Sequence, residues 1–194
     1  MSDTAQAFAP TRAKLYTAPL GTDVSGITGD SPLPIAFEDN GAIDLSAGYS
    51  FTPAGAPTRT IVREYWDDQI FYASEAPSDD LPTWDITFLE SNISVVENAF
   101  GVSVDEDGSL VYVGGIPPHK VMVLDLADAA ASPKTRRFLI PDASVAINGS
   151  VGASGNDKLT RTPIRFSANP TTGELGEGVT GLFRMWSSWL TDGS

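Results

Sequence analysis

The chain has 194 residues, 41% of them hydrophobic, with no cysteine and a formal net charge of −13 at pH 7. This length can bury one good core, and no apolar run approaches the roughly twenty residues that a membrane-spanning helix needs. Without cysteine, disulfides and thiolate metal sites are excluded. No basic segment followed by an apolar stretch opens the chain, so no secretory signal is expected. The 18 glycines and 14 prolines between short β-prone runs favour an all-β domain with many turns.

The first third of the chain predicts a polar arm followed by short strands. Residues 1–12 are polar and rich in alanine without a clear period, so they predict a flexible amino-terminal arm. Strands are expected over 13–19, 33–38 and 42–51. Asp39-Asn40-Gly41 predicts a hairpin turn, because Asn-Gly tolerates positive φ. Residues 52–58 predict a loop, 60–65 a strand, and 70–74 an extension of the sheet.

The stretch from Thr83 to Gly101 changes its hydrophobic period halfway along. Trp84, Ile86 and Phe88 alternate with polar residues, which predicts a strand with one buried face. Three later residues have helical spacing, which predicts a helix over about 91–100 that packs on a sheet through one stripe of side chains. Ser91 is the expected N-cap and Gly101 the residue after the helix end. The stripe consists of Ile93, Val96 and Phe100.

The remaining sequence predicts further strands and a carboxyl-terminal extension. Strands are expected at 110–113, 120–124, 135–141 and 158–168, with a loop at 149–155. Leu182 to Leu190 suits either a helix with one apolar stripe or a buried strand. The predicted organisation is therefore one β domain over 13–169, preceded by the flexible amino-terminal residues 1–12 and followed by an extension over 170–194.

Several fragments in the chain resemble the major tail tube proteins of long-tailed bacteriophages, especially those that infect actinobacteria. They occur in the order in which that family has them. The resemblance covers roughly residues 13–169 and rests on the set rather than on any one fragment. The fragments are Ala13 to Gly21, Gly41 to Tyr49, the acidic Trp66-Asp67-Asp68, the Phe88 to Asn92 junction, Arg137 to Val145, and Thr162 to Asn169.

The resemblance implies a two-sheet β-sandwich or barrel of the tail tube type, flanked by the helix at 91–100. Six copies would close into a ring, and rings would stack into a hollow virion tube that delivers DNA without binding it specifically. Assembly would take place in the bacterial host cytoplasm, with no membrane, no cofactor and no catalysis. A long loop over about 47–66, including Thr52, Pro53, Arg59 and Arg63, would contact the next ring. Expected partners are the tape measure protein, the tail terminator and the distal tail protein.

Charge is distributed unevenly along the chain. Residues 64–119 contain twelve carboxylates and no lysine or arginine, whereas residues 120–165 contain seven basic and four acidic residues. Opposite polarity of this kind suits head-to-tail association of identical subunits, although a solvated acidic surface explains it equally well. A tube that conducts DNA should also avoid a basic wall. The acids expected at the lumen or at subunit seams are Asp67, Asp68, Glu75, Asp79 and Asp80.

Catalytic and metal sites have weak support in this sequence. His119 is the only histidine, and no nucleophile or metal-binding pattern accompanies it. Asp105 to Gly108 begins like a calcium loop but lacks the later glycine and glutamate, so a β-turn is expected.

Two alternatives to a tail tube subunit remain open: another tube-like tail component, such as a terminator or distal tail protein, and a β-sandwich carbohydrate-binding module.

Overall fold

The computed structural model describes residues 8, 10–45, 49–53, 58–63, 70–76, 81–89, 93–102, 105–109, 118–128, 134–149, 152–154, 159–170, 175 and 181–188. Within these ranges the chain is mainly β, with one helix, α1 (Ile93–Phe100). The strands are β1 (Arg12–Pro19), β2 (Glu38–Ala42), β3 (Tyr49–Thr52), β4 (Thr58–Arg63), β5 (Ile70–Ala76), β6 (Thr83–Phe88), β7 (His119–Ala127), β8 (Thr135–Ile147), β9 (Gly152–Ser154), β10 (Leu159–Ala168) and β11 (Arg184–Ser187).

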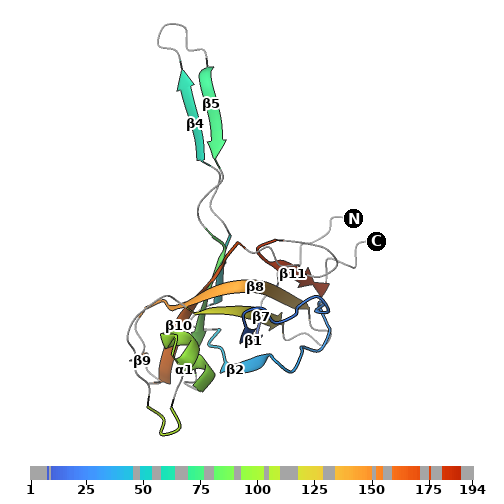
Figure 1. Cartoon of the computed structure of the whole chain (residues 1–194), viewed down its shortest axis with the longest axis vertical. Coiled ribbons are helices and arrows are strands. Elements are labelled where there is room, and N and C mark those ends of the chain that lie inside the picture. Colours follow the sequence, from blue (N-terminus) through green and yellow to red (C-terminus); the bar gives the residue numbers. More distant parts are fainter. Residues whose placement is uncertain are drawn as a thin grey trace.

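One antiparallel sheet forms the body of the molecule (Figure 1). Its strands follow the order β2-β1-β7-β8-β10-β6-β3, while β11 pairs with β8 and β9 with β10. Two separate sheets were expected, but β8 joins the two groups of strands by pairing with β7, β10 and β11. The region 170–194, expected as an extension, also contributes to this sheet through β11.

A bulge in β8 marks the corner of the sheet. The β7–β8 register shifts between Lys120 and Met122, so that Pro141 and Asp142 lie opposite a single residue of β7. Proline has no N–H for the ladder and is tolerated at such a bulge. Before the bulge the other neighbour of β8 is β11, and after it that neighbour is β10.

The sheet curls until its two halves enclose one core. Phe51 of β3 and Phe138 of β8 have ring centroids 5.6 Å apart, although β10 and β6 lie between their strands in the sheet. In a flat sheet three interstrand spacings would separate them by about 14 Å. Trp84 and Phe183 complete this aromatic cluster, with centroids 5.3 Å apart. The predicted burial of Trp84, Ile86 and Phe88 is confirmed.

A smaller apolar cluster covers the outer face of β1, β7 and β8. Val121, Val123 and Leu139 point to this side. The segment between β1 and β2 packs over them through buried Val24 and Ile27, and Leu175 from the carboxyl-terminal region joins them. The strand expected at 33–38 is absent from the described structure because this covering segment occupies most of the range. Its amide at Phe37 donates to Pro34 O in a turn instead.

The predicted turn at Asp39-Asn40-Gly41 is wrong, because these residues lie inside β2. They pair with β1, whose register shifts between Lys14 and Tyr16. Gly41 does have positive φ, at +87°, so the local conformation was anticipated but serves a bulged strand. The buried Asn40 side chain donates to Thr17 Oγ1 over 3.0 Å, which fixes β2 on β1.

Helix α1 packs near β2, β8 and β10. Among the side chains of α1 that the structure describes, Val95 is fully buried, Val96 and Phe100 are half-buried, and the Ile93 side chain is outside the described structure. Phe100 of the expected stripe contacts the main core, and Val95, outside that stripe, is buried in the same core. Gly101 ends the helix with φ +67°, and its amide donates to Glu97 O.

Candidate assembly surfaces

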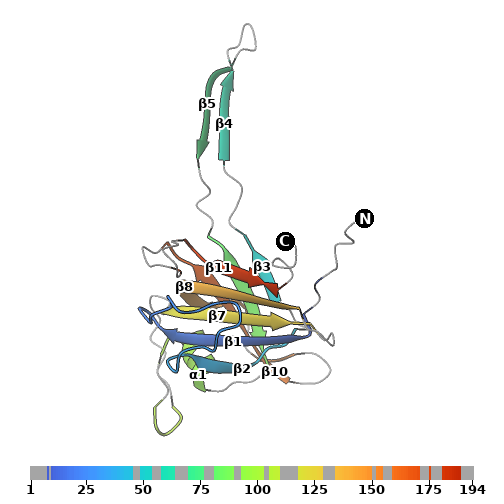
Figure 2. The same ribbon diagram turned by 90° about the vertical axis from the view of Figure 1, so that its right-hand side faces the viewer.

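Strands β4 and β5 form a two-stranded ribbon that stands clear of the body in both views (Figures 1 and 2). They pair from Thr58 opposite Ala76 to Arg63 opposite Ile70. Residues 70–74, expected to extend the sheet, do form a strand, β5, which pairs with β4 in a separate two-stranded sheet. The loop expected over 47–66 likewise contains strands β3 and β4. We call β4 and β5 together the arm; from here on this name does not refer to the amino-terminal residues 1–12.

The arm is inserted between two neighbouring strands of the main sheet. β3 and β6 are antiparallel, with Thr52 directly opposite Thr83 and Phe51 opposite Trp84. The Phe51 and Trp84 rings stack with centroids 4.8 Å apart, inside the core. The arm thus replaces the short turn that normally closes such a hairpin, and its base is attached next to the aromatic cluster of the main core.

The residues expected to contact a neighbouring ring lie at the base of the arm and in its first strand, β4. Thr52 and Pro53 are exposed at the base. The backbone register sets Arg59 opposite Glu75, and Arg63 opposite Ile70. For β4 and β5 the structure describes the backbone and not the side chains. The predicted acids Asp67, Asp68, Asp79 and Asp80 lie outside the described residues.

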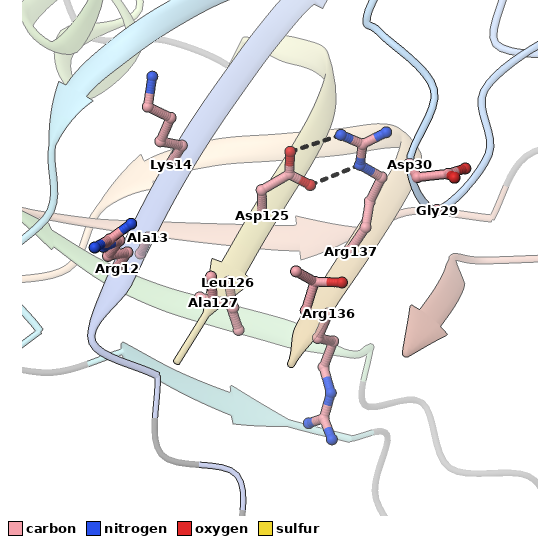
Figure 3. A pocket seen from close by; sticks show the side chains of 11 residues that line it. Arg12, Ala13, Lys14, Gly29, Asp30, Asp125, Leu126, Ala127, Arg136 and Arg137 are labelled. Carbon is pink, nitrogen blue, oxygen red and sulfur yellow. Dashed lines mark hydrogen bonds and ion pairs between the residues drawn. The ribbon is translucent and has the colours of Figure 1, made fainter. Parts of the chain in front are cut away.

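A pocket of about 370 Å³ lies where the end of β7 meets β1 and β8 (Figure 3). Lys14, Asp125 and Arg137 form a row across these three strands, because each is the direct cross-strand neighbour of the next. Arg12 lies two residues before Lys14, on the same face of β1. Four of the twelve basic residues of the chain line the pocket: Arg12, Lys14, Arg136 and Arg137.

Arg137 holds one wall of this pocket together. It forms a bidentate ion pair with Asp125, with distances of 2.6 and 2.7 Å, and this hydrogen-bonded partner raises the pKa of the guanidinium. Its Nη1 donates to Thr28 O and Ser31 O, both at 2.8 Å. One half-buried side chain therefore ties the segment between β1 and β2 to the sheet.

The other basic groups of the pocket differ from Arg137 in their contacts. Lys14 Nζ lies 3.3 Å from Asp39 in an exposed pair, and hydrogen bonding to Asp39 raises its pKa. Among the described residues, no group forms a hydrogen bond or ion pair with the Arg12 guanidinium. Arg136 turns away from the other labelled side chains and lies 5.1 Å over the Phe8 ring (Figure 3). Sequence reasoning missed this site because only the strand register brings its members together.

The predicted turn at Asp105 to Gly108 is confirmed as an exposed, ordered structure. Gly108 N donates to Asp105 O over 2.9 Å, and Asp105 N donates to Ser109 O over 2.8 Å. Hydrogen bonds from Ser109 lower the pKa of Asp107, so this carboxyl stays ionised at neutral pH. Every residue from Asp105 to Ser109 is exposed. We call this segment the acidic turn.

Part of the charge polarity along the sequence is used within the subunit. Arg165 forms a bidentate pair with Asp85, at 2.7 and 2.9 Å, and Asn148 also donates to this carboxylate. Arg161 donates to the buried Asp44 over 2.8 Å. These basic residues of the 120–165 stretch are therefore already paired inside one subunit.

His119 has a carboxylate partner but does not form a catalytic arrangement with the described residues. Its Nδ1 lies 2.8 Å from Asp142 Oδ1, and Asn169 Nδ2 donates to the same oxygen over 3.0 Å. Ser144 is the cross-strand neighbour of His119, but its hydroxyl donates to Ser167 O. Across the described part of the chain, no three His, Asp or Glu side chains gather as metal ligands would.

Comparisons with known proteins leave the family unassigned. No family model matches the chain, and no curated protein matches it. None of the helices in the described part of the chain has the length and apolar character required to cross a membrane.

Proposed function

We propose that this protein is the structural subunit of a bacteriophage tail tube, with copies that close into rings and rings that stack through the arm. On this proposal the curled sheet is the tail tube form of a β-sandwich or barrel, six copies make a ring, and DNA passes through the lumen. The tape measure protein, terminator and distal tail protein would be its partners in the virion. The proposal assigns the subunit no catalytic role.

The projecting arm is the observation that supports this proposal. A two-stranded hairpin is marginally stable in water when it has nothing to pack against. Among the described residues, β4 and β5 pair only with each other, and they stand away from the body in both views (Figures 1 and 2). A ribbon of this kind gains support when it contacts another molecule, and another copy in a stack would supply that contact.

Removing the arm tests the proposal directly. In the variant, residues 54–80 are deleted and Pro53 is joined to Leu81 through Asn-Gly, which leaves a short hairpin loop between Thr52 and Thr83. Pro82 is retained because its carbonyl accepts a hydrogen bond from Ala168 N. We expect the variant to fold and to form single rings but no tubes, as seen by negative-stain electron microscopy. The wild-type chain should form both.

The control leaves the arm in place and replaces Val96 by alanine in helix α1, which lies across the body from the arm (Figure 1). This control should form tubes like wild type. Full-length tubes from the armless variant would show that stacking resides elsewhere. A wild-type chain that stays monomeric at every concentration would overturn the proposal itself.

A further inference from the structure

The pocket at the end of β7 has basic groups that the fold leaves available. Arg137 is saturated by Asp125 and two carbonyls, so it serves as a wall. Among the described residues Arg12 makes no hydrogen bond or ion pair, and Lys14 pairs with the exposed Asp39 at 3.3 Å and lies 5.9 Å over the Tyr16 ring. An exposed pair of that kind contributes about 0–1 kcal/mol and exchanges readily. The pocket is therefore suited to a carboxylate that reaches Arg12 and Lys14 together.

The acidic turn supplies carboxylates in a form that can bind without further ordering. Its backbone is closed by two hydrogen bonds, and Ser109 restrains Asp107. Asp105 and Glu106 are exposed beside it, and Asp105 Oδ2 accepts from Ser109 Oγ over the longer distance of 3.4 Å. Binding by a preformed turn avoids most of the conformational entropy that a free acidic peptide would lose.

The turn and the pocket of one copy lie at opposite ends of β7. Gly101 lies next to Pro118, the residue before β7. A Cβ added at Gly101 would be only 2.9 Å from Pro118 Cδ. The acidic turn begins four residues after Gly101, whereas the pocket lies at Asp125 to Ala127. Lys120 and Ala127 are seven residue steps apart along the strand, or about 23 Å. The turn therefore has to meet the pocket of a second copy.

We propose that the acidic turn of one copy binds in the Arg12 and Lys14 pocket of the next copy. This inference rests on the proposed self-assembly and specifies one contact within it. The contact is heterologous, so repeated use produces a closed ring or an open helix, depending on the rotation between copies. Nucleic acid is a poor competitor for the pocket, since the chain as a whole carries a charge of −13.

Complementary charge reversal tests the contact with the full chain. The pocket variant is Arg12→Glu with Lys14→Glu, and the turn variant is Asp105→Lys with Glu106→Lys; Asp107 is retained because it accepts from Ser109 N. Each variant alone should associate roughly tenfold or more weakly than wild type in sedimentation velocity. An equimolar mixture should recover association, because basic turns then meet acidic pockets while the unaltered surfaces also match.

The outcomes separate this contact from self-assembly in general. If wild type assembles and both variants assemble equally well, the contact is wrong while the tube proposal stands. Weak variants whose mixture stays weak also overturn the contact, once circular dichroism shows that both are folded. A wild-type chain that never associates overturns both. Binding of a short DNA duplex to wild type that the pocket variant loses would assign the pocket to nucleic acid instead.

Discussion

At the scale of single residues, two bidentate arginine pairs of the same chemistry differ in surroundings. The Arg137 and Asp125 side chains are 11% and 29% exposed, and Arg137 also serves two carbonyls of the covering segment. The Arg165 and Asp85 side chains are 45% and 29% exposed. Breaking a half-buried, multiply bonded pair leaves several polar groups unsatisfied, whereas water replaces the partner of an exposed group.

We therefore expect Arg137→Ala to lower the free energy of unfolding by about 2–3 kcal/mol, and Arg165→Ala by less than about 1 kcal/mol. Urea denaturation of the two variants under one set of conditions measures the difference. Equal losses would mean that the bonds from Arg137 to Thr28 and Ser31 contribute nothing.

Tyr49 links burial to a pH dependence. Burial raises the pKa of its hydroxyl to about 12 from the ordinary value of 10.0, and the nearby Arg136 opposes this shift. As the pH rises, the unfolded chain loses this proton first. The associated stability is complete below about pH 10 and falls as the pH approaches 12, by roughly 1–2 kcal/mol once screening at this half-buried site is allowed for.

Replacing Tyr49 with phenylalanine should remove this part of the alkaline loss. Unfolding free energies of wild type and Tyr49→Phe, compared between pH 9 and pH 12, give the difference. Identical pH profiles for the two proteins would show that Tyr49 titrates as an exposed tyrosine, and tyrosinate absorbance provides an independent check.

At the scale of elements, helix α1 offers two adjacent valines in different environments. Val95 is fully buried in the main core, and Val96 is half-buried. Truncating a buried valine removes two methyl groups and leaves a cavity. We expect Val95→Ala to reduce stability by about 2 kcal/mol and Val96→Ala by less than about 1 kcal/mol, measured by thermal or urea unfolding. A larger loss for Val96→Ala than for Val95→Ala would support the stripe that helical periodicity predicts as the packing face.

The corner of the sheet illustrates how one element serves two neighbours. β8 pairs with β11 before its bulge and with β10 after it, and Pro141 lies at the change. Because the halves curl toward one another, Phe51 can reach Phe138 across the core. Phe51, next to the base of the arm, therefore packs against residues from both halves of the sheet.

At the scale of the whole molecule, the proposed assembly predicts a stability that depends on concentration. Association that occurs only in the folded state stabilises that state by mass action. The apparent midpoint of thermal unfolding should therefore rise with protein concentration for wild type. The rise should be smaller for the armless variant, which keeps ring closure and loses stacking. A midpoint independent of concentration for wild type would argue against assembly under those conditions.

The sequence by itself determined the features that depend on near neighbours in the chain. Alternation placed Trp84, Ile86 and Phe88 on one buried face, and a change of period followed by Gly101 located the helix and its end. The acidic turn was evident from Asp105 to Gly108. Such features follow from local backbone preferences and side-chain spacing, both of which can be evaluated within about ten residues.

Only the tertiary structure decided which strands meet and in which register. Gly41 takes its positive φ in a bulge because β2 pairs with β1, and β5 leaves the main sheet because it pairs with β4. Arg12 and Lys14 line one pocket with Asp125 and Arg137 because β1, β7 and β8 pair in this register. These pairings join residues far apart in the chain, and their free energy depends on the whole set of strand contacts, which no local pattern encodes.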